Sequence, residues 1–206
     1  MLQPLTKRNI MLAKYLLAVV ISGIAFGSAE ASEWSIDPVH SSIGFAVKHM
    51  MVSTVRGSFG KYESKISFDP AKPNALNAEL TIEANSINTG VEKRDDHLRS
   101  ADFFDVEKFP KITYKSKKIE ALGDSRYRVT GDLTMKDVTK EVILEGEGFG
   151  STYKNPWGST VTAVSAKGTI NRDDFHLLWN VELEGGGVLV SKNVVLEIEL
   201  ELVKGE

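Results

Sequence analysis

The 206-residue chain contains no cysteine. This absence excludes disulfide bonds, thiolate metal sites, thiol catalysis and thiol–disulfide exchange, so stability must come from an apolar core. The chain also lacks an excess of positive charge, since its 25 Lys and Arg residues are outnumbered by 28 Asp and Glu residues. A mixed, mildly acidic surface argues against nucleic acid as a partner.

Long apolar runs are equally scarce, and the one that stands out lies near the start of the chain. Residues 15–26 are predominantly apolar but too few for a transmembrane helix, which needs about 20 residues. A basic segment precedes this run, and the small-x-small sequence Ala29-Glu30-Ala31 follows it. This order predicts a cleaved export signal over residues 1–31, with Met11 as an alternative start. We therefore expect residues 32–206 to form a periplasmic protein without a permanent membrane anchor.

The remaining chain is dominated by alternation of apolar and polar residues with a period of two. This pattern is typical of β-strands with one buried and one solvated face, and it is most regular from Val194 to Leu202. Turn residues separate about eight such segments, without a linker or a repeat. The pattern predicts one all-β antiparallel domain. Long strands and uninterrupted alternation favour a closed barrel over a sandwich.

Small residues recur on the predicted inward faces, among them Ala78, Gly131 and Gly146. We interpret them as leaving volume for an apolar cavity, because bulky residues would have filled it. The alternative is that the glycines only permit strand coiling and bulges.

Residues 86–114 interrupt the strand pattern with a charged segment and then an aromatic one. Thr89 and Glu92 have the spacing of a capping box, which predicts a helix over about residues 90–102. One stripe of this helix would carry Arg94, His97, Leu98 and Ala101. Four apolar residues follow before Pro110: Phe103, Phe104, Val106 and Phe109. This arrangement predicts an apolar lid with a basic rim, suited to an amphiphilic ligand; the alternative is a solvated helix whose Phe residues cap the core.

Several motifs spread over the chain resemble those of one known family. They are Ile36-Asp37-Pro38-Val39-His40-Ser41-Ser42-Ile43-Gly44-Phe45, Val55-Arg56-Gly57-Ser58-Phe59, Arg94-Asp95-Asp96-His97-Leu98, Asp102-Phe103-Phe104-Asp105-Val106, Gly131-Asp132-Leu133-Thr134 and Asn171-Arg172-Asp173-Asp174-Phe175. The chain resembles the YceI-like family of exported, lipocalin-like proteins that bind polyisoprenoids and related lipids. The resemblance implies an extended eight-stranded antiparallel barrel with a long hydrophobic pore, one helical insertion at its mouth and a lipid tail inside. Residues 32–206 would form this lipid-binding domain.

Two residues depart from the family pattern. Asp137 and His176 stand where the family usually has glycine. The first change is expected to affect only a hairpin, whereas the second places a titratable group in a tight turn and would alter one end of the pore.

The strand register, the aromatic segment and the resemblance together predict a set of lipid-contacting residues. His49 continues the inward face of Ile43, Phe45 and Val47, so it is either a hydrogen-bonded core histidine or a contact for a polar ligand atom. Arg94 and His97 are expected to face the pore opening and meet the head group. The full predicted set is Phe45, His49, Leu80, Arg94, His97, Leu98, Phe103, Phe104, Leu144, Gly146 and Phe175.

The sequence offers little for catalysis or metal binding. Its four histidines show no metal-ligand spacing, and no nucleophile elbow or phosphate loop is present, so neither catalytic nor metal-ligating residues are predicted. The leading hypothesis is a periplasmic protein that binds, transports or stores a long-chain isoprenoid such as a quinone or a prenyl phosphate, with no other cofactor.

Three alternatives stay open at this point. The first is an enzyme acting on a lipid with His97 and Asp95 or Asp102 as acid and base. The second is a stress-related interaction protein with a solid core, whose segment 103–109 docks a partner. The third concerns assembly only, because a homodimer is compatible with the sequence.

Overall fold

The computed structural model describes residues 31–70, 72–148 and 151–205. The export signal predicted over residues 1–31 lies outside this part except for Ala31, so it stays a prediction. The described chain forms one antiparallel sheet with one α-helix and two short 3-10 helices. No helix in these ranges is both long enough and apolar enough to span a bilayer.

The elements follow one another as a series of strands with a single helical interruption. In chain order they are β1 Ser32–Ile36, β2 Ser42–His49, β3 Ser53–Phe59, β4 Tyr62–Asp69, β5 Lys72–Glu83, η1 Ala84–Ser86, β6 Ile87–Asn88, α1 Glu92–Arg99, β7 Lys111–Gly123, β8 Arg126–Met135, β9 Val138–Gly148, β10 Tyr153–Lys154, β11 Thr160–Asn171, η2 Arg172–Phe175 and β12 Val190–Lys204.

The sheet closes on itself into a barrel because β12 pairs with β11 along nearly its whole length. The closed ring contains eight strands, in the order β11, β9, β8, β7, β5, β4, β1 and β12. The predicted eight-stranded antiparallel barrel is therefore confirmed. The other edge of β12 pairs first with β2 and then with β1, so β2, β3 and β6 extend the wall at one end.

The inward faces follow the alternation seen in the sequence. In β12 every second residue from Val194 to Leu202 is apolar and contacts the core, while Glu197, Glu199 and Glu201 between them face outward. Glu197 pairs there with Arg56 of β3 at 3.2 Å, although the two are not in adjacent strands. The period of two thus decides which face is buried.

Two clusters of apolar side chains lie inside the barrel, one toward each end. One lies near β1 and the C-terminus, where the Trp34 and Phe68 rings stack with centroids 4.8 Å apart. The other lies toward α1 and η2 and includes the fully buried Phe175. Tyr114 and Leu200 pack against both clusters, so they mark the middle of the barrel.

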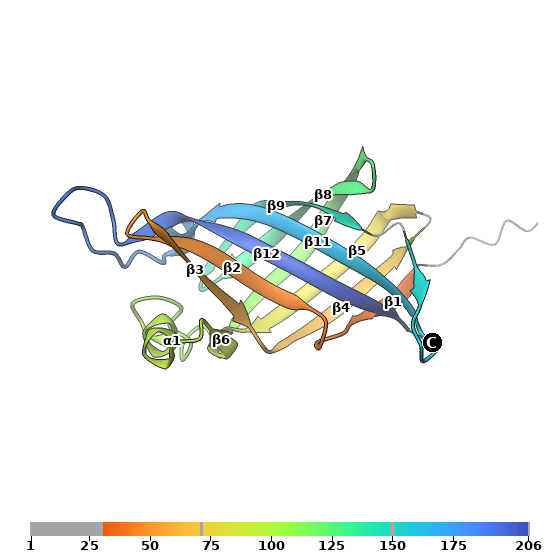
Figure 1. Ribbon diagram of the computed structural model, residues 1–206, viewed down its shortest axis with the longest axis horizontal. Helices are drawn as coiled ribbons and strands as arrows, with labels where there is room; N and C mark the ends of the chain where they lie inside the picture. Colours follow the sequence, from red (N-terminus) through yellow and green to blue (C-terminus); the bar gives the residue numbers. More distant parts are fainter. Residues whose placement is uncertain (1–30, 71, 149–150, 206) are drawn as a thin grey trace, which may run out of the picture.

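We call the barrel end beside α1 the mouth. In Figure 1, α1, the β2–β3 turn and the long loop after η2 lie at this end, opposite the C-terminus.

Helix α1 begins after Val91, which makes no side-chain cap, so the predicted capping box is wrong. Thr89 is instead bonded to Asp95, whose Oδ1 accepts from the Thr89 backbone N–H at 2.9 Å and from its Oγ1 at 2.5 Å.

Candidate functional site

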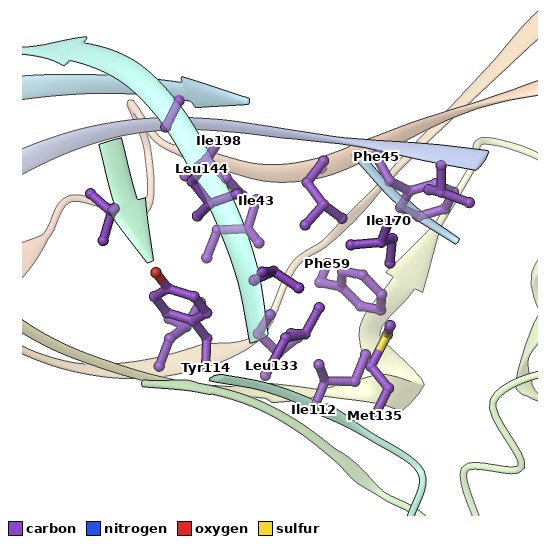
Figure 2. Close-up of a pocket in the computed structure, with 18 of the residues that line it drawn as sticks. Ile43, Phe45, Phe59, Ile112, Tyr114, Leu133, Met135, Leu144, Ile170 and Ile198 are labelled. Atoms are coloured by element: carbon purple, nitrogen blue, oxygen red, sulfur yellow. The ribbon is translucent and has the colours of Figure 1, made fainter. Parts of the chain in front are cut away.

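The barrel encloses an apolar cavity of about 240 Å³. Its wall is built from the inward faces of the ring strands and β2, and at the mouth from Leu98, Phe103, Phe104 and Leu177. Figure 2 shows side chains from several strands pointing into one shared space: Ile43, Phe45, Phe59, Ile112, Tyr114, Leu133, Met135, Leu144, Ile170 and Ile198. The cavity contradicts the alternative of a solid core.

Charge is nearly absent from the cavity wall. Among the described lining residues only Glu79 and Arg172 are charged. The Glu79 carboxylate pairs with Lys115 Nζ at 2.6 Å on the neighbouring strand. Such a wall favours a hydrocarbon, because burying an unpaired polar or charged group in it would cost free energy.

The glycines of the wall do not simply leave empty volume, as the sequence interpretation supposed. A Cβ on Gly131 would lie 2.6 Å from the Tyr114 hydroxyl oxygen, so this glycine makes room for the Tyr114 ring. A Cβ on Gly146 would clash with the Ser165 carbonyl oxygen of β11. Gly146 lines the cavity, but its missing side chain marks the close approach of two backbones. These two glycines are thus explained by the packing of the Tyr114 ring and of the β11 backbone, and not by empty volume.

Seven of the eleven predicted lipid-contacting residues lie on the cavity wall. They are Phe45, Leu80, Leu98, Phe103, Phe104, Leu144 and Gly146. Their contact with a ligand stays a prediction, but the fold brings these seven, distant in the chain, to one surface.

Arg94 and His97 do not line the cavity, contrary to expectation. Arg94 turns back to Thr89, with Nε donating to Oγ1 at 2.7 Å and Nη2 to the carbonyl oxygen at 2.9 Å. His97 Nε2 lies 2.9 Å from Asp102 Oδ2. The physical reason is that these groups find polar partners locally, whereas the apolar mouth offers none.

Aromatic contacts explain what His97 does at the mouth. Its ring packs edge-on against Phe103, with centroids 5.1 Å apart, and against Trp179, at 4.8 Å. Trp179 belongs to the loop after η2, so the three rings join this loop to the segment after α1. Sequence reasoning missed Trp179; an aromatic residue in a loop beside the Asn-Arg-Asp-Asp-Phe motif was the available signal.

His49 and Phe175 also lie off the cavity wall. His49 is half-buried at the end of β2, where its carbonyl accepts from the Val52 N–H at 3.1 Å across the turn. Phe175 is buried beneath the mouth, inside the apolar cluster and not at its surface. His49 is the last residue of β2 before the turn to β3, and Phe175 lies in η2 after β11. Strand register alone therefore did not give the position of either residue.

The acid and base expected of a lipid-directed enzyme are not assembled at the cavity. Asp95 is buried against Thr89, and His97 and Asp102 pair with each other away from the wall. The enzyme hypothesis required these groups to meet at the cavity, and the structure does not place them there.

A cluster of possible metal ligands lies outside the barrel, where the sequence predicted none. Donor atoms of Asp37, His40 and Glu201 lie within 4.8 Å of one another. Asp37 Oδ2 accepts from His40 Nδ1 at 2.8 Å, and this hydrogen bond lowers the pKa of Asp37 and raises the pKa of His40. This hydrogen bond accounts for the proximity of two of the three groups.

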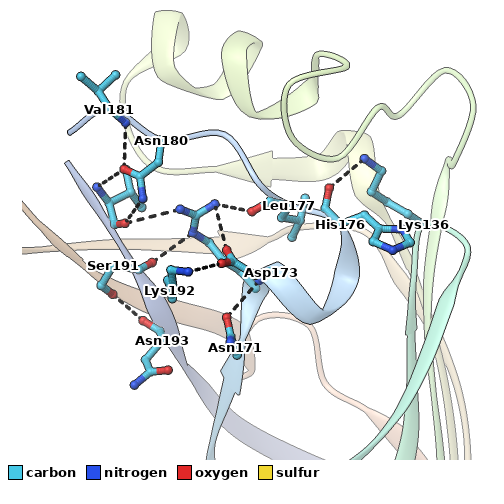
Figure 3. Close-up of polar contacts among 12 residues, drawn as sticks. Lys136, Asn171, Asp173, His176, Leu177, Asn180, Val181, Ser191, Lys192 and Asn193 are labelled. Carbon is cyan, nitrogen blue, oxygen red and sulfur yellow. Dashed lines mark hydrogen bonds and ion pairs between the residues drawn. The ribbon is translucent and has the colours of Figure 1, made fainter. Parts of the chain in front are cut away.

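Arg172 is a second residue that sequence reasoning left without a role. It is buried, and its guanidinium donates to three backbone carbonyls: Ser191 at 3.0 Å, Val190 at 3.4 Å and Leu177. Figure 3 shows these contacts beside Asn180, whose side chain bonds both the N–H and the carbonyl of Val190. Arg172 thus fastens the loop at the mouth to β12.

The two departures from the family pattern contact each other. His176 Nδ1 lies 3.2 Å from Asp137 Oδ1. The Lys136 ammonium donates to the His176 carbonyl at 3.2 Å, as Figure 3 shows. His176 has a left-handed φ of 58°, which explains why glycine is usual there. Its side chain is exposed and off the cavity wall, so it does not alter the end of the pore as expected.

An antiparallel eight-stranded barrel around an apolar cavity defines a lipocalin-like protein. The YceI-like domain model matches residues 34–202, and the chain belongs to this family. A UPF0312 protein of Staphylococcus aureus strain MSSA476 is 42% identical over 171 residues, covering 82% of this chain and 96% of the relative.

Solved structures show the same fold. BcnA of Burkholderia cenocepacia matches with a TM-score of 0.67 and 25% identity, over 81% of this chain and 99% of that one. The YCEI protein of Campylobacter jejuni matches with a TM-score of 0.64 and 32% identity, over 84% and 98%. A polyisoprenoid binding domain from Saccharophagus degradans matches with a TM-score of 0.59 over 84% and 99%, and at 16% identity it shows the fold alone.

Proposed function

We propose that this protein binds a long-chain isoprenoid or a similar amphiphilic lipid, with the tail inside the barrel. The observation that carries the proposal is the apolar cavity that passes from the wall around Ile66 to the mouth at Leu98 and Phe104. Each buried methylene contributes about 0.8 kcal/mol, so a tail of a few isoprene units offsets an association cost of about 4–15 kcal/mol. The description of the Saccharophagus degradans domain as polyisoprenoid-binding supports the same ligand class.

The mouth is built in a way that supports binding rather than catalysis. Phe104 packs edge-on against Phe59 of β3, with centroids 5.9 Å apart, and Phe103 contacts Trp179 at 5.3 Å. These contacts place apolar rings between the cavity and solvent. A site of this kind excludes water from a hydrocarbon tail and needs few polar groups to orient it.

The finer proposal is a periplasmic carrier or store, and exposed apolar residues at the mouth support the carrier role. Met50, Met51 and Val52 protrude at the β2–β3 turn, and the Met50 N–H donates to the Leu189 carbonyl of the neighbouring loop at 2.8 Å. Leu178 and Val181 are exposed in the same loop, which joins η2 to β12. A cluster of exposed apolar side chains is typical of a surface that meets a partner or a membrane, where a carrier would collect its lipid.

The test is to purify the protein from its own host and to identify bound molecules by native mass spectrometry and solvent extraction. The proposal predicts a co-purifying lipid with a long apolar chain, and uptake of a fluorescent isoprenoid by the delipidated protein. Repeated purification without any lipid, together with no uptake of the probe, would contradict it.

A further inference from the structure

The loop between β1 and β2 brings one histidine and two carboxylates together outside the barrel. Donor atoms of Asp37, His40 and Glu201 lie within 4.8 Å of one another, and His40 Nδ1 lies 2.8 Å from Asp37 Oδ2. The nitrogen and oxygen ligands of Zn²⁺ lie about 2.0–2.2 Å from the ion and therefore roughly 3–4 Å from each other. Small side-chain rotations would bring all three donors to one such ion.

The backbone holds the residues that carry these donors. Strand β12 pairs with β2 as far as Glu199 and with β1 from Leu202, so Glu201 lies where β12 changes its partner. At this point the Asp37 N–H donates to the Glu201 carbonyl at 2.9 Å, and the Glu201 N–H donates to Ser41 Oγ at 2.9 Å. The donors are thus fixed relative to each other before any ion binds, which favours a site of defined geometry.

The Asp37 carboxylate is oriented by its second oxygen. Asp37 Oδ1 accepts from the Val39 N–H at 2.8 Å, and this bond directs Oδ2 toward His40. Bonds of this kind orient the ligands of metal sites and increase their affinity.

Two other histidines of the chain show what is particular to His40. His97 pairs with Asp102 at 2.9 Å and His176 pairs with Asp137 at 3.2 Å, so a histidine beside one aspartate is not unusual here. Within the part of the chain that the structure describes, the pair at His40 is the one with a third donor of the same kinds in reach. The third donor is Glu201, from a strand distant in the sequence.

The charges of the cluster also suit a divalent cation. With a neutral imidazole, the two carboxylates give a charge of about −2. On the same outer face of β12, Glu197 has Arg56 Nε at 3.2 Å, whereas no lysine or arginine of the described chain pairs with Asp37 or Glu201. Two adjacent carboxylates repel each other, and a bound dication would remove this repulsion.

We propose that Asp37, His40 and Glu201 bind one divalent transition-metal ion such as Zn²⁺. One nitrogen and two oxygen donors suit Zn²⁺ better than Ca²⁺ or Mg²⁺, which take oxygen ligands. On binding, the ion takes the place of the proton between His40 and Asp37, and this proton passes to solvent.

The ion would fasten the β1–β2 loop to β12. None of its three ligands lines the apolar cavity, so the inference does not rest on the proposed function. A metal that binds the folded chain stabilises it, which is a gain for a protein that has no cysteine and so no disulfide.

The experiment titrates untagged, chelator-treated protein with ZnCl₂ by isothermal calorimetry. Wild type is compared with Glu201→Gln and His40→Ala, and with two controls. Glu199→Gln changes the neighbouring outward glutamate of β12, and His176→Ala removes the histidine of a pair without a third donor. Wild type should bind one equivalent of Zn²⁺. Either ligand variant should bind about tenfold more weakly or worse, and the controls should stay within about twofold of wild type.

A second readout uses wild type alone, so it does not depend on how the variants fold. In proton NMR spectra the His40 ring resonances should shift on adding ZnCl₂, and those of His97 and His176 should shift much less. The thermal unfolding midpoint should also rise with ZnCl₂, and more in wild type than in Glu201→Gln. Absence of zinc binding by wild type would overturn the inference, as would equal zinc binding by wild type and both ligand variants.

Discussion

Filling the cavity tests whether the barrel interior is the binding site. Ala78 lies in β5 opposite Ile66 and lines the cavity, so its side chain already points inward. Ala78→Trp would extend an indole into the space that the tail requires. Gly146 also lines the cavity, but Gly146→Phe would push against the β11 backbone and disturb the fold.

The expected loss follows from the part of the tail that the indole displaces. If the indole takes the place of about four tail carbons, at about 0.8 kcal/mol each, binding weakens by about 3 kcal/mol, or roughly 100-fold. Overpacking adds a stability cost of about 1–3 kcal/mol, which chemical denaturation would measure separately.

The assay is a titration of a fluorescent isoprenoid against wild type, Ala78→Trp and Ala163→Trp. Ala163 is exposed on β11, so its tryptophan adds the same indole outside the cavity and should leave the dissociation constant unchanged. A folded Ala78→Trp protein that binds like wild type would refute the placement of the tail in the barrel.

Three further predictions concern stability, pH and the mouth. Arg172→Met should lower the free energy of unfolding by about 3 kcal/mol, because the Leu177 and Ser191 carbonyls lose the guanidinium donor, while the Val190 carbonyl keeps its bond from Asn180. The half-exposed Arg128→Met should cost less than about 1 kcal/mol by the same denaturation assay. The stabilisation from the His40–Asp37 pair should be complete between pH 3.8 and 6.5. Above this window it is lost because His40 deprotonates through its raised pKa. Below this window it is lost because Asp37 is protonated through its lowered pKa. A His40→Ala protein should therefore differ most from wild type within the window, and a constant difference from pH 3 to 9 would contradict this. Met51 has a left-handed φ of 61°, so Met51→Gly should raise the free energy of unfolding by about 1 kcal/mol and slow lipid uptake from vesicles; unchanged uptake would remove Met51 from the transfer surface.

The strands could be predicted from the sequence, but their closure needed more. Alternation in β12 shows which side chains face inward, and the structure confirms it from Val194 to Leu202. Periodicity carries no information about which strand pairs with which, so a closed barrel was predicted from strand length, uninterrupted alternation and resemblance, and the β11–β12 pairing that closes it is seen only in the structure.

The wall of the site was easier to predict than its polar groups. Leu80 and Leu144 follow from the strand period, because an apolar side chain on an inward face has nowhere else to go. Arg94 and His97 did not follow from helix spacing, because each has a nearby oxygen to bond. For charged side chains the local partner decides direction more strongly than the face of the helix does.

Glycines were the least informative residues for the cavity. A missing side chain leaves the same mark in a sequence whether it makes room for a ligand, for a ring such as that of Tyr114 above Gly131, or for a neighbouring strand as at Gly146. Likewise, Asp137 and His176 each stood out singly, but their contact at 3.2 Å depends on the fold that brings η2 to the β8–β9 turn.

The most direct test of the account is to locate the tail by nuclear Overhauser contacts between an isoprenoid and methyl-labelled isoleucines. Ile112, Ile170 and Ile198 line the cavity from three strands, whereas Ile143 of β9 is exposed on the outer face. We predict contacts from the tail to all three inward methyl groups and none to Ile143. Contacts confined to Ile143, or a bound lipid without contacts to the inward methyl groups, would contradict binding inside the barrel.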